Sequence, residues 1–185
     1  MGEIGSPSPV LLLLAAFSRY QPALDWARGQ GEKTWGPVAL ESPAFEFTQT
    51  DYYQPTMGPG LRKIFWLFEY RWDPSGLPDV KILTNRWEEE YAATAGLAEP
   101  RPLNLDPGYL SLAKLVLAST KDHSHRIYLR QGIYAEITLS YSQQRWQARP
   151  WTFADYRRED YQQFFLQGRT YLHQRIRQEP KPCAG

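Results

Sequence analysis

The sequence contains one cysteine and no long apolar run. The single cysteine, Cys183, cannot form an internal disulfide, so a disulfide-stabilised fold is excluded and thiol catalysis is disfavoured. The longest apolar stretch, Val10 to Phe17, has eight residues, whereas a membrane-spanning helix needs about 20. The residues before it include Glu3 but not the lysine or arginine that a secretory signal requires. We therefore expect a cytoplasmic protein with no membrane partner.

Signatures of several common enzyme classes are also missing. The sequence has no P-loop, no glycine-rich dinucleotide turn, no G-x-S-x-G, no C-x-x-C and no H-E-x-x-H. This disfavours P-loop NTPases, Rossmann dehydrogenases, serine hydrolases, zinc ribbons and zincin proteases. The cofactor stays unknown, and so does whether the protein is an enzyme.

The net charge is small, at +1 for 185 residues. A nearly neutral chain is not suited to bind polyanions through its overall charge. The charge is nevertheless uneven, because residues 1–120 are net acidic and residues 121–185 are net basic. Two interpretations stay open for the basic part: a solvated, arginine-rich C-terminal helix, or a site for an anionic ligand or RNA.

Hydrophobic periodicity predicts alternating strands and helices in the first part of the chain. The expected order is strand, helix, extended arm, strand and helix, over Val10–Phe17, Pro22–Gln30, Val38–Phe47, Arg62–Trp72 and Pro78–Ala95. Arg101 to Leu105 would add an edge strand, because Pro102 fits only at an edge. The prediction is an α+β fold with a mostly antiparallel sheet in ferredoxin-like (βαββαβ) order. Val10–Phe17 and Arg62–Trp72 should be adjacent central strands.

Three details of this interpretation bear on the site. The segment Asp51 to Gly60 is rich in proline and glycine and is expected to be a lid-like loop. Lys81 and Glu88 are placed on the solvent-exposed face of their helix. Asp106-Pro-Gly is expected to turn the chain, with Asp106 capping the next helix or orienting a base.

The second part of the chain should add a β-hairpin and a C-terminal helix. Leu110 to Ser119 fits a helix or a strand, and we favour the helix. Arg126–Leu129 and Ile133–Tyr141 form a hairpin around Gly132, and an aromatic stripe predicts a helix over Arg158–Arg177. The organisation is a flexible leader over residues 1–9, one domain over 10–177 and a disordered tail over 178–185. The oligomeric state is not indicated.

Seven sequence blocks resemble one bacterial family. In order, they are Phe45-Glu-Phe-Thr with Asp51-Tyr-Tyr and Met57-Gly; Lys81-Ile-Leu-Thr-Asn; Leu103-Asn-Leu-Asp-Pro-Gly-Tyr-Leu; Ala113-Lys-Leu-Val-Leu-Ala; Lys121-Asp-His-Ser-His-Arg-Ile-Tyr-Leu; Gly132-Ile-Tyr-Ala-Glu; and Pro150-Trp-Thr-Phe-Ala-Asp-Tyr. Together they resemble the family known as domain of unknown function 4416 over nearly the whole chain. The resemblance implies no activity.

The densest polar block of the chain is Lys121-Asp-His-Ser-His-Arg. In extended conformation His123 and His125 share one face, as metal ligands would. Two ligands are too few, and Asp106 or Glu136 would have to complete the set. We predict no metal there, because a chain of this size folds without one. An anion or acid–base site, and a purely structural polar junction, are the remaining interpretations.

The hairpin after this block repeats its chemistry. Arg126 and Tyr128 share one face of the first strand, and Tyr134 and Glu136 share one face of the second. If the faces coincide, they form either the floor of a cleft or an ordinary solvated face. In a cleft, arginine would bind an anion, tyrosine would stack or donate, and glutamate would accept a proton.

Two functions from different classes are consistent with these residues. In the first, the protein binds or acts on a small molecule that bears a phosphate or carboxylate. His125 would transfer a proton, and Glu136 or Asp106 would orient its imidazole ring. The ligand-binding residues would be Lys121, His123, Arg126, Tyr128 and Tyr134. In the alternative, a noncatalytic module binds RNA or protein through an open sheet face and the basic C-terminal helix.

Overall fold

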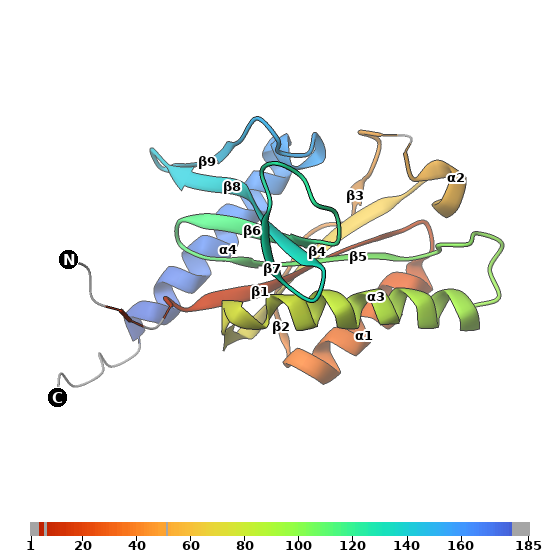
Figure 1. The fold of residues 1–185 in the computed structure, drawn as a ribbon, viewed down its shortest axis with the longest axis horizontal. Helices are drawn as coiled ribbons and strands as arrows, with labels where there is room; N and C mark the ends of the chain where they lie inside the picture. The colour runs from red at the N-terminus through yellow and green to blue at the C-terminus, as the bar shows by residue number, and fades with distance from the viewer. Residues whose placement is uncertain (1–3, 6, 51, 179–185) are drawn as a thin grey trace.

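The computed structural model describes residues 4–5, 7–50 and 52–178, and shows a mixed α/β protein with an antiparallel sheet (Figure 1). In this part of the chain nine strands and four α-helices are present. The strands are β1 Val10–Ser18, β2 Val38–Glu41, β3 Phe45–Glu46, β4 Arg62–Trp72, β5 Asn104–Leu110, β6 Lys114–Ser119, β7 Ile127–Arg130, β8 Ile133–Ser142 and β9 Arg145–Ala148. The helices are α1 Gln21–Trp35, α2 Gln54–Met57, α3 Leu77–Thr94 and α4 Glu159–Gln178.

Strands β1 and β4 are neighbours in the interior of the sheet, which confirms the prediction for the two longest apolar runs. The strand order is β2-β4-β1-β5-β6-β8-β7, with β3 paired to β4 and β9 to β8. Every residue of β1 is buried. A strand buried on both faces has no polar alternation, which is why its sequence is continuously apolar.

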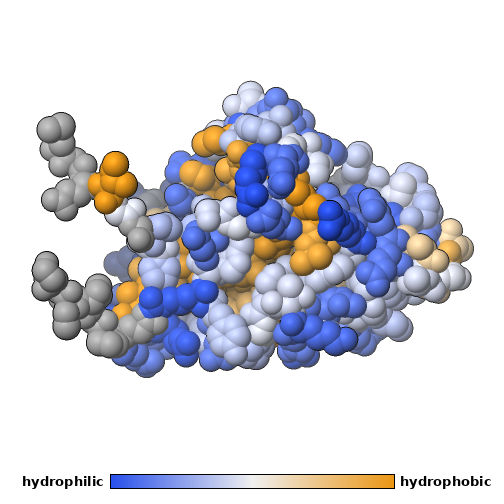
Figure 2. Space-filling model, turned by 60° about the horizontal axis from the view of Figure 1, so that its bottom comes forward, coloured by the Kyte–Doolittle hydropathy of each residue, from blue (hydrophilic) through white to orange (hydrophobic). Residues whose placement is uncertain are grey.

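Helices cover both faces of this part of the sheet (Figure 1). Leu12 and Leu14 of β1 pack with residues of α1 and α3, whereas Leu11 and Leu13 pack with residues of α4. Alternate residues of a strand point to opposite faces, so one apolar run supplies two cores. The side with α1 and α3 has a mostly hydrophilic surface with a broken band of hydrophobic side chains (Figure 2). Within the described chain, every helix is too short or too polar to cross a bilayer.

The first helix is longer than predicted, and the lid-like loop contains a short helix. Gly29 and Gly31 do not end α1, which continues to Trp35 and stops at Gly36 with a φ of 88°. Gly31 is needed inside the helix, because a β-carbon there would lie 2.7 Å from the ring of Phe68. Close packing against β4 therefore overrides the helix-breaking tendency of glycine.

Three predictions between Arg101 and Ser119 are wrong. The edge strand expected over Arg101–Leu105 is instead β5, Asn104–Leu110, which lies inside the sheet. The Asp106-Pro-Gly segment does not turn the chain but lies in β5, an interior strand between β1 and β6. The segment Lys114–Ser119 is strand β6, not a helix, because its apolar residues pack on both faces of the sheet. Burial on two faces favours a continuous apolar strand over a helix with one apolar stripe.

Strands β5 and β6 are hydrogen-bonded over a short stretch only. Their paired residues run from Gly108↔Leu117 to Leu110↔Leu115. Gly108 is required for this contact, because a β-carbon there would lie 2.1 Å from the Val116 carbonyl oxygen. The ladder stops beside Pro107, which has no N–H to donate. Beyond this point β6 continues to pair with β8 alone, so a space opens between β5 and β6.

The hairpin and the C-terminal helix form as predicted, and β7 lies at the edge of the sheet. Gly132 has a φ of 77° in the turn between β7 and β8. Nine strands exceed the four of a simple ferredoxin-like sheet. Residues 1–3 and 6 of the predicted leader, and residues 179–185 of the predicted tail with Cys183, lie outside the described residues. Gln178 belongs to α4, not to the tail.

Candidate functional site

A cavity of about 510 Å³ lies at the end of the sheet where β5 and β6 separate. Pockets for small molecules are typically about 300–1,000 Å³. Segments far apart in the sequence line it: the ends of β1, β4, β5 and β6, the loop before α2, one side of α3, Glu136 of β8 and the residues around the 3₁₀ turn Asp155–Arg157. Its lining includes five basic side chains, Lys63, Lys81, Arg101, Lys121 and Arg126, and three carboxylates, Asp106, Glu136 and Asp155.

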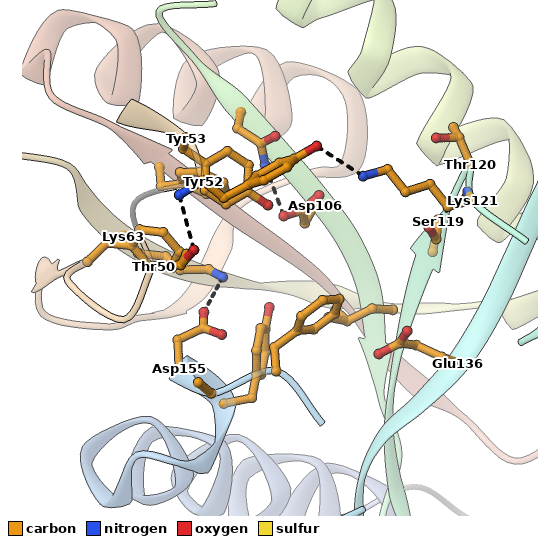
Figure 3. A pocket seen from close by; sticks show the side chains of 18 of the residues that line it. Thr50, Tyr52, Tyr53, Lys63, Asp106, Ser119, Thr120, Lys121, Glu136 and Asp155 are labelled. Carbon is orange, nitrogen blue, oxygen red and sulfur yellow. Dashed lines mark hydrogen bonds and ion pairs between the residues drawn. The ribbon is translucent and has the colours of Figure 1, made fainter. Parts of the chain in front are cut away.

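The deep wall carries a buried ion pair between β4 and the 3₁₀ turn. Lys63 Nζ lies 2.7 Å from Asp155 Oδ2, and both side chains are buried (Figure 3). The ammonium group also lies 4.5 Å from the ring centre of Tyr156 and 5.3 Å from that of Phe17. Burying an ammonium group is costly, and the contacts with Asp155 and the ring faces offset that cost.

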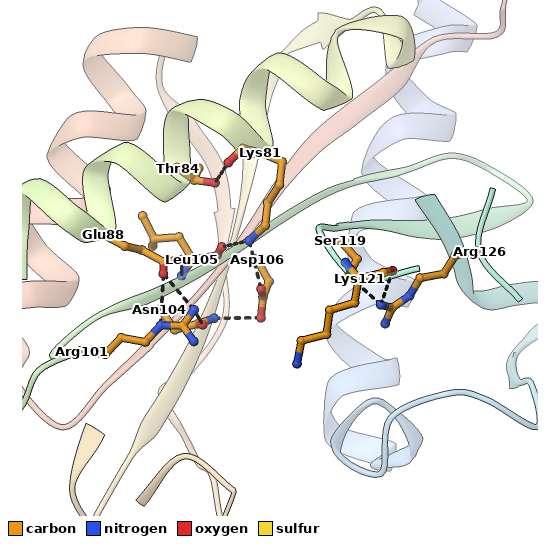
Figure 4. Close-up of polar contacts among 10 residues, drawn as sticks. All are labelled: Lys81, Thr84, Glu88, Arg101, Asn104, Leu105, Asp106, Ser119, Lys121 and Arg126. Carbon is orange, nitrogen blue, oxygen red and sulfur yellow. Dashed lines mark hydrogen bonds and ion pairs between the residues drawn. The ribbon is translucent and has the colours of Figure 1, made fainter. Parts of the chain in front are cut away.

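The wall between α3 and β5 is a network of buried polar groups (Figure 4). Lys81 Nζ donates to the Leu105 carbonyl oxygen at 2.8 Å and lies 3.5 Å from Asp106 Oδ1. Asn104 Nδ2 donates to Asp106 Oδ2 at 2.9 Å, and Asn104 Oδ1 accepts from Arg101. The solvent-exposed placement predicted for Lys81 is therefore wrong, since its side chain reaches from the helix into the sheet.

The solvent-exposed position predicted for Glu88, also in α3, is wrong as well. Its Oε1 accepts from the Leu105 N–H at 2.7 Å, and its Oε2 accepts from Arg101 Nη2 at 2.8 Å. Burial raises the pKa of this carboxyl, and the positive charges of Lys81 and Arg101 oppose the rise. Glu88 thus fixes both the start of β5 and the arginine that borders the cavity.

On the β6–β8 wall, Glu136 gathers the polar side chains of the Lys121–Arg126 block. Arg126 Nε donates to Glu136 Oε2 at 2.8 Å, and His125 Nε2 lies 3.3 Å from the same oxygen. Arg126 also donates to Ser119 Oγ at 2.6 Å and to the Lys121 carbonyl oxygen at 2.9 Å. Both side chains of the Arg126–Glu136 pair are buried, so this arginine is committed to protein contacts.

The exposed side chains that line the cavity, here called its mouth, include Lys121 and Tyr52. Lys121 Nζ points to the Tyr52 hydroxyl at 3.4 Å and lies 5.3 Å from the centre of its ring (Figure 3). Within the described chain, Lys121 has no carboxylate within 4.0 Å, whereas each of the other four basic side chains has one. The excess positive charge of the lining is therefore at the mouth.

Two tyrosine hydroxyls complete the interior. Burial, followed by the charge of Asp106, raises the pKa of Tyr53. Burial also raises the pKa of Tyr156 well above its usual range, with further contributions from Asp155 and Asp106. Both phenols therefore stay neutral hydrogen-bonding groups near a carboxylate-rich wall.

The structure gathers most, but not all, of the residues predicted for the site. The ones that line the cavity are Asp106, Lys121, His123, Arg126 and Glu136. His125 lies just outside, stacked between the rings of His123 and Trp151. Tyr128 and Tyr134 face each other across the outer hairpin and do not line the cavity. In the described residues, no three histidine, cysteine or acidic side chains are grouped to hold a metal.

Sequence reasoning missed the deep wall of the cavity. Lys63 lies near the start of β4, and its only sequence signal for burial is that it shares a face of the strand with Phe65 and Leu67. Lys81 and Glu88 carried a clearer signal: with Leu77 and Thr84 they follow steps of four, three and four residues, which place all of them on one helical stripe. All four are buried.

Comparison with known proteins gives one match. The model of the family described as "Domain of unknown function (DUF4416)" matches residues 8–171, nearly the whole chain. The chain belongs to this family. The DUF4416 match covers every element that lines the cavity. Neither the curated proteins nor the solved structures give a match to the chain.

Proposed function

We propose that this DUF4416 protein binds a small molecule carrying a phosphate or carboxylate group, and that the anionic group lies at the mouth of the cavity. The observation that carries the proposal is the single unpaired lysine at the opening: Lys121 has no carboxylate partner among the described residues. Hydrogen bonds to charged groups contribute about 1.5–3 kcal/mol, more than neutral ones. An anion bound beside Lys121 would supply the negative charge that no described carboxylate provides there.

The interior supports an anion at the mouth and not at the deep wall. Lys63 is paired with Asp155, and Arg126 with Glu136, in both cases with both side chains buried. An anion there would have to compete with a carboxylate already in contact. Arg126, predicted from the sequence as an anion-binding residue, therefore acts by positioning the Lys121 segment through its bond to the Lys121 carbonyl oxygen.

The proposal is for binding, and proton transfer by His125 stays a prediction. His125 does not line the cavity, although its ring nitrogen is close to Glu136, which does. The RNA- or protein-binding alternative has less support, since helices cover both faces of the central strands. The cytoplasmic location also stays a prediction from the sequence.

Substitution of Lys121 tests the proposal. Thermal unfolding of the wild-type protein should shift upward in sodium phosphate or sodium citrate relative to sodium chloride of equal ionic strength, because a ligand of the native state stabilises it. Lys121→Ala should weaken binding of the effective anion by roughly tenfold in calorimetric titration. Lys114→Ala is the matched control, since Lys114 is exposed at the other end of β6 and does not line the cavity. Equal binding by the two variants, or no anion effect on the wild type, would contradict the proposal.

We also propose that β2, β4, β1 and β5 with α1 and α3 constitute a ferredoxin-like unit, to which β6–β9 and α4 are added. The support is the antiparallel order β2-β4-β1-β5, with α1 following β1 and α3 following β4. Both helices pack on the same face. An experimental structure with a different order of these four strands would contradict this description.

A further inference from the structure

The hydroxyl of Tyr156 lies at the cavity without a hydrogen-bond partner in the described part of the chain. The residue is 1% exposed, and its ring is fixed by stacking on Phe165 and by edge contacts with Phe65 and Tyr161. A buried hydroxyl that forms no hydrogen bond costs free energy, and native proteins rarely keep one without use. Because Tyr156 lines the cavity, a ligand in the cavity is the partner that could satisfy its hydroxyl.

Carboxylates with spare acceptor capacity lie near this hydroxyl. Asp106 accepts from Asn104 on one oxygen and contacts Lys81 on the other, and its side chain is 31% exposed. Asp155 contacts Lys63 through Oδ2. A carboxylate offers about four acceptor positions, so these groups can each take further donors. Asp155, Asp106 and Tyr156 all line the same cavity.

The interior and the mouth therefore suit different parts of one ligand. Deep in the cavity the described cations are already paired, and the remaining polar groups include the Tyr53 and Tyr156 hydroxyls and the spare acceptor positions of Asp106 and Asp155. Neutral groups that both donate and accept, namely hydroxyls, match this lining. At the mouth the unpaired Lys121 matches an anionic group.

We propose that the ligand is a polyhydroxylated anion, either a sugar phosphate or a sugar acid, with its hydroxyls toward Tyr156 and Asp106 and its anionic group at Lys121. This inference rests on the proposed function, because it names the ligand class of the same cavity. Phosphate and carboxylate share the chemistry that Lys121 recognises, and the experiment separates them.

Calorimetric titration with matched probes tests the inference. Glucose 6-phosphate is compared with n-hexyl phosphate, which keeps the phosphate but has no hydroxyls, and gluconate with hexanoate. Inorganic phosphate reports the anion site alone. We expect one polyhydroxylated probe to bind at least about tenfold more tightly than its hydroxyl-free counterpart, since several hydrogen bonds are lost in the counterpart. Which of the two pairs shows this preference identifies the anionic group.

Tyr156→Phe should reduce that preference by roughly two- to tenfold, the effect of one neutral hydrogen bond, without changing the affinity for inorganic phosphate. Tyr161→Phe is the control, because the Tyr161 hydroxyl is also buried and unpartnered among the described residues but does not line the cavity. Both variants should unfold at or above the wild-type temperature, since each loses a buried unsatisfied hydroxyl.

Two results overturn the inference in distinguishable ways. If the hydroxyl-free probes bind as tightly as glucose 6-phosphate and gluconate, the ligand class is wrong, and if Tyr156→Phe keeps the full preference, the hydroxyls of the ligand do not lie at Tyr156; in both cases the anion site stands. If none of the five probes binds, the proposed function fails and the ligand class fails with it.

Discussion

The deep wall and the mouth of the cavity hold lysines in opposite settings. Lys63 lies in the interior, with its side chain 4% exposed, its charge matched by Asp155 and aromatic rings around it. Lys121 is exposed, and among the described residues its ammonium group contacts the Tyr52 hydroxyl and ring, with no carboxylate within 4.0 Å. The same residue type is thus part of the folded framework at one end and free for a ligand at the other.

This difference follows from the cost of burying charge. Removing an ammonium group from water costs several kcal/mol, and only a close counter-charge offsets that cost. At the mouth water still solvates Lys121, so no protein carboxylate is needed. Stability should therefore depend on the deep wall, and ligand affinity on the mouth. Substitutions at three sites, Asp155, Glu88 and Asp160, test how burial sets stability, in order of decreasing effect.

Loss of the deep carboxylate should have the largest effect. Asp155→Ala leaves the Lys63 charge buried without a partner, and we expect a loss of about 3–5 kcal/mol in unfolding free energy. Urea denaturation followed by circular dichroism measures it. The double variant Lys63→Met, Asp155→Leu is the control: it removes both charges and should recover most of the stability. A loss below about 1 kcal/mol in Asp155→Ala would show that the pair is not essential.

Substitution of Glu88 should lower the unfolding free energy by less than Asp155→Ala does, and its effect should depend on pH. Glu88→Ala leaves the buried Leu105 N–H without its acceptor, at a cost of about 1–3 kcal/mol. Glu88→Gln should cost less, because its amide oxygen can still accept from Leu105. Burial raises the folded-state pKa of Glu88 above the ordinary value of 4.5, so the native state binds more protons than the unfolded state between these two values.

This difference in proton binding determines how the stability contribution of Glu88 changes with pH. The contribution of Glu88 to wild-type stability should be full below pH 4.5 and should decline as the pH rises through the raised pKa. Glu88→Gln lacks this titration, so the difference in stability between wild type and variant should shift in favour of the variant across that window. Denaturant titrations from pH 4 to 7 measure it. Parallel pH profiles for the two proteins would contradict the raised pKa.

The comparison also explains how far the sequence predicts the molecule. The central strands and long helices follow from hydrophobic patterns, since β1 and the Ile64–Phe68 part of β4 are continuously apolar and the long helices carry apolar stripes. The residues at the cavity mouth can be predicted from the sequence because Lys121, His123 and Arg126 lie close together in it. Both features depend on local patterns that a single chain segment carries.

The deep wall depends on long-range contacts that no local pattern records. Lys63 and Asp155 are 92 residues apart, and Lys81 reaches a strand 24 residues later. The Pro107-Gly108 pair, typical of a turn, instead occurs where β5 separates from β6, and there the tertiary contact overrides the local preference. The ligand-binding roles of Tyr128 and Tyr134 were predicted from strand parity alone. Parity fixes the face of a residue but not its distance from the cavity.

The exposed ion pair between Arg158 and Asp160 should contribute less to stability than the buried ion pair between Lys63 and Asp155. Arg158, which directly precedes α4, donates to both carboxylate oxygens of Asp160 in the first turn of the helix. The Asp160 side chain is 44% exposed. The hydrogen bonds from Arg158 hold the pKa of Asp160 below its ordinary value of 3.8. Its stabilising effect is therefore present above pH 3.8 and is lost as the pH falls through the lowered pKa.

Asp160→Asn should accordingly have the smallest effect. Solvent screens the pair, so we expect a loss of about 0.2–1 kcal/mol at pH 7, far below that of Asp155→Ala. The loss should shrink in 1 M sodium chloride, where the Debye length is about 3 Å, and should diminish as the pH falls below 3.8 through the lowered pKa of Asp160. Glu159→Gln, an exposed neighbour in the same helical turn, separates the contribution of the helix dipole from that of the ion pair. Urea denaturation of both variants measures the two contributions. A loss as large as that of Asp155→Ala, or one that grows at low pH, would mean that burial does not decide the strength of ion pairs in this protein.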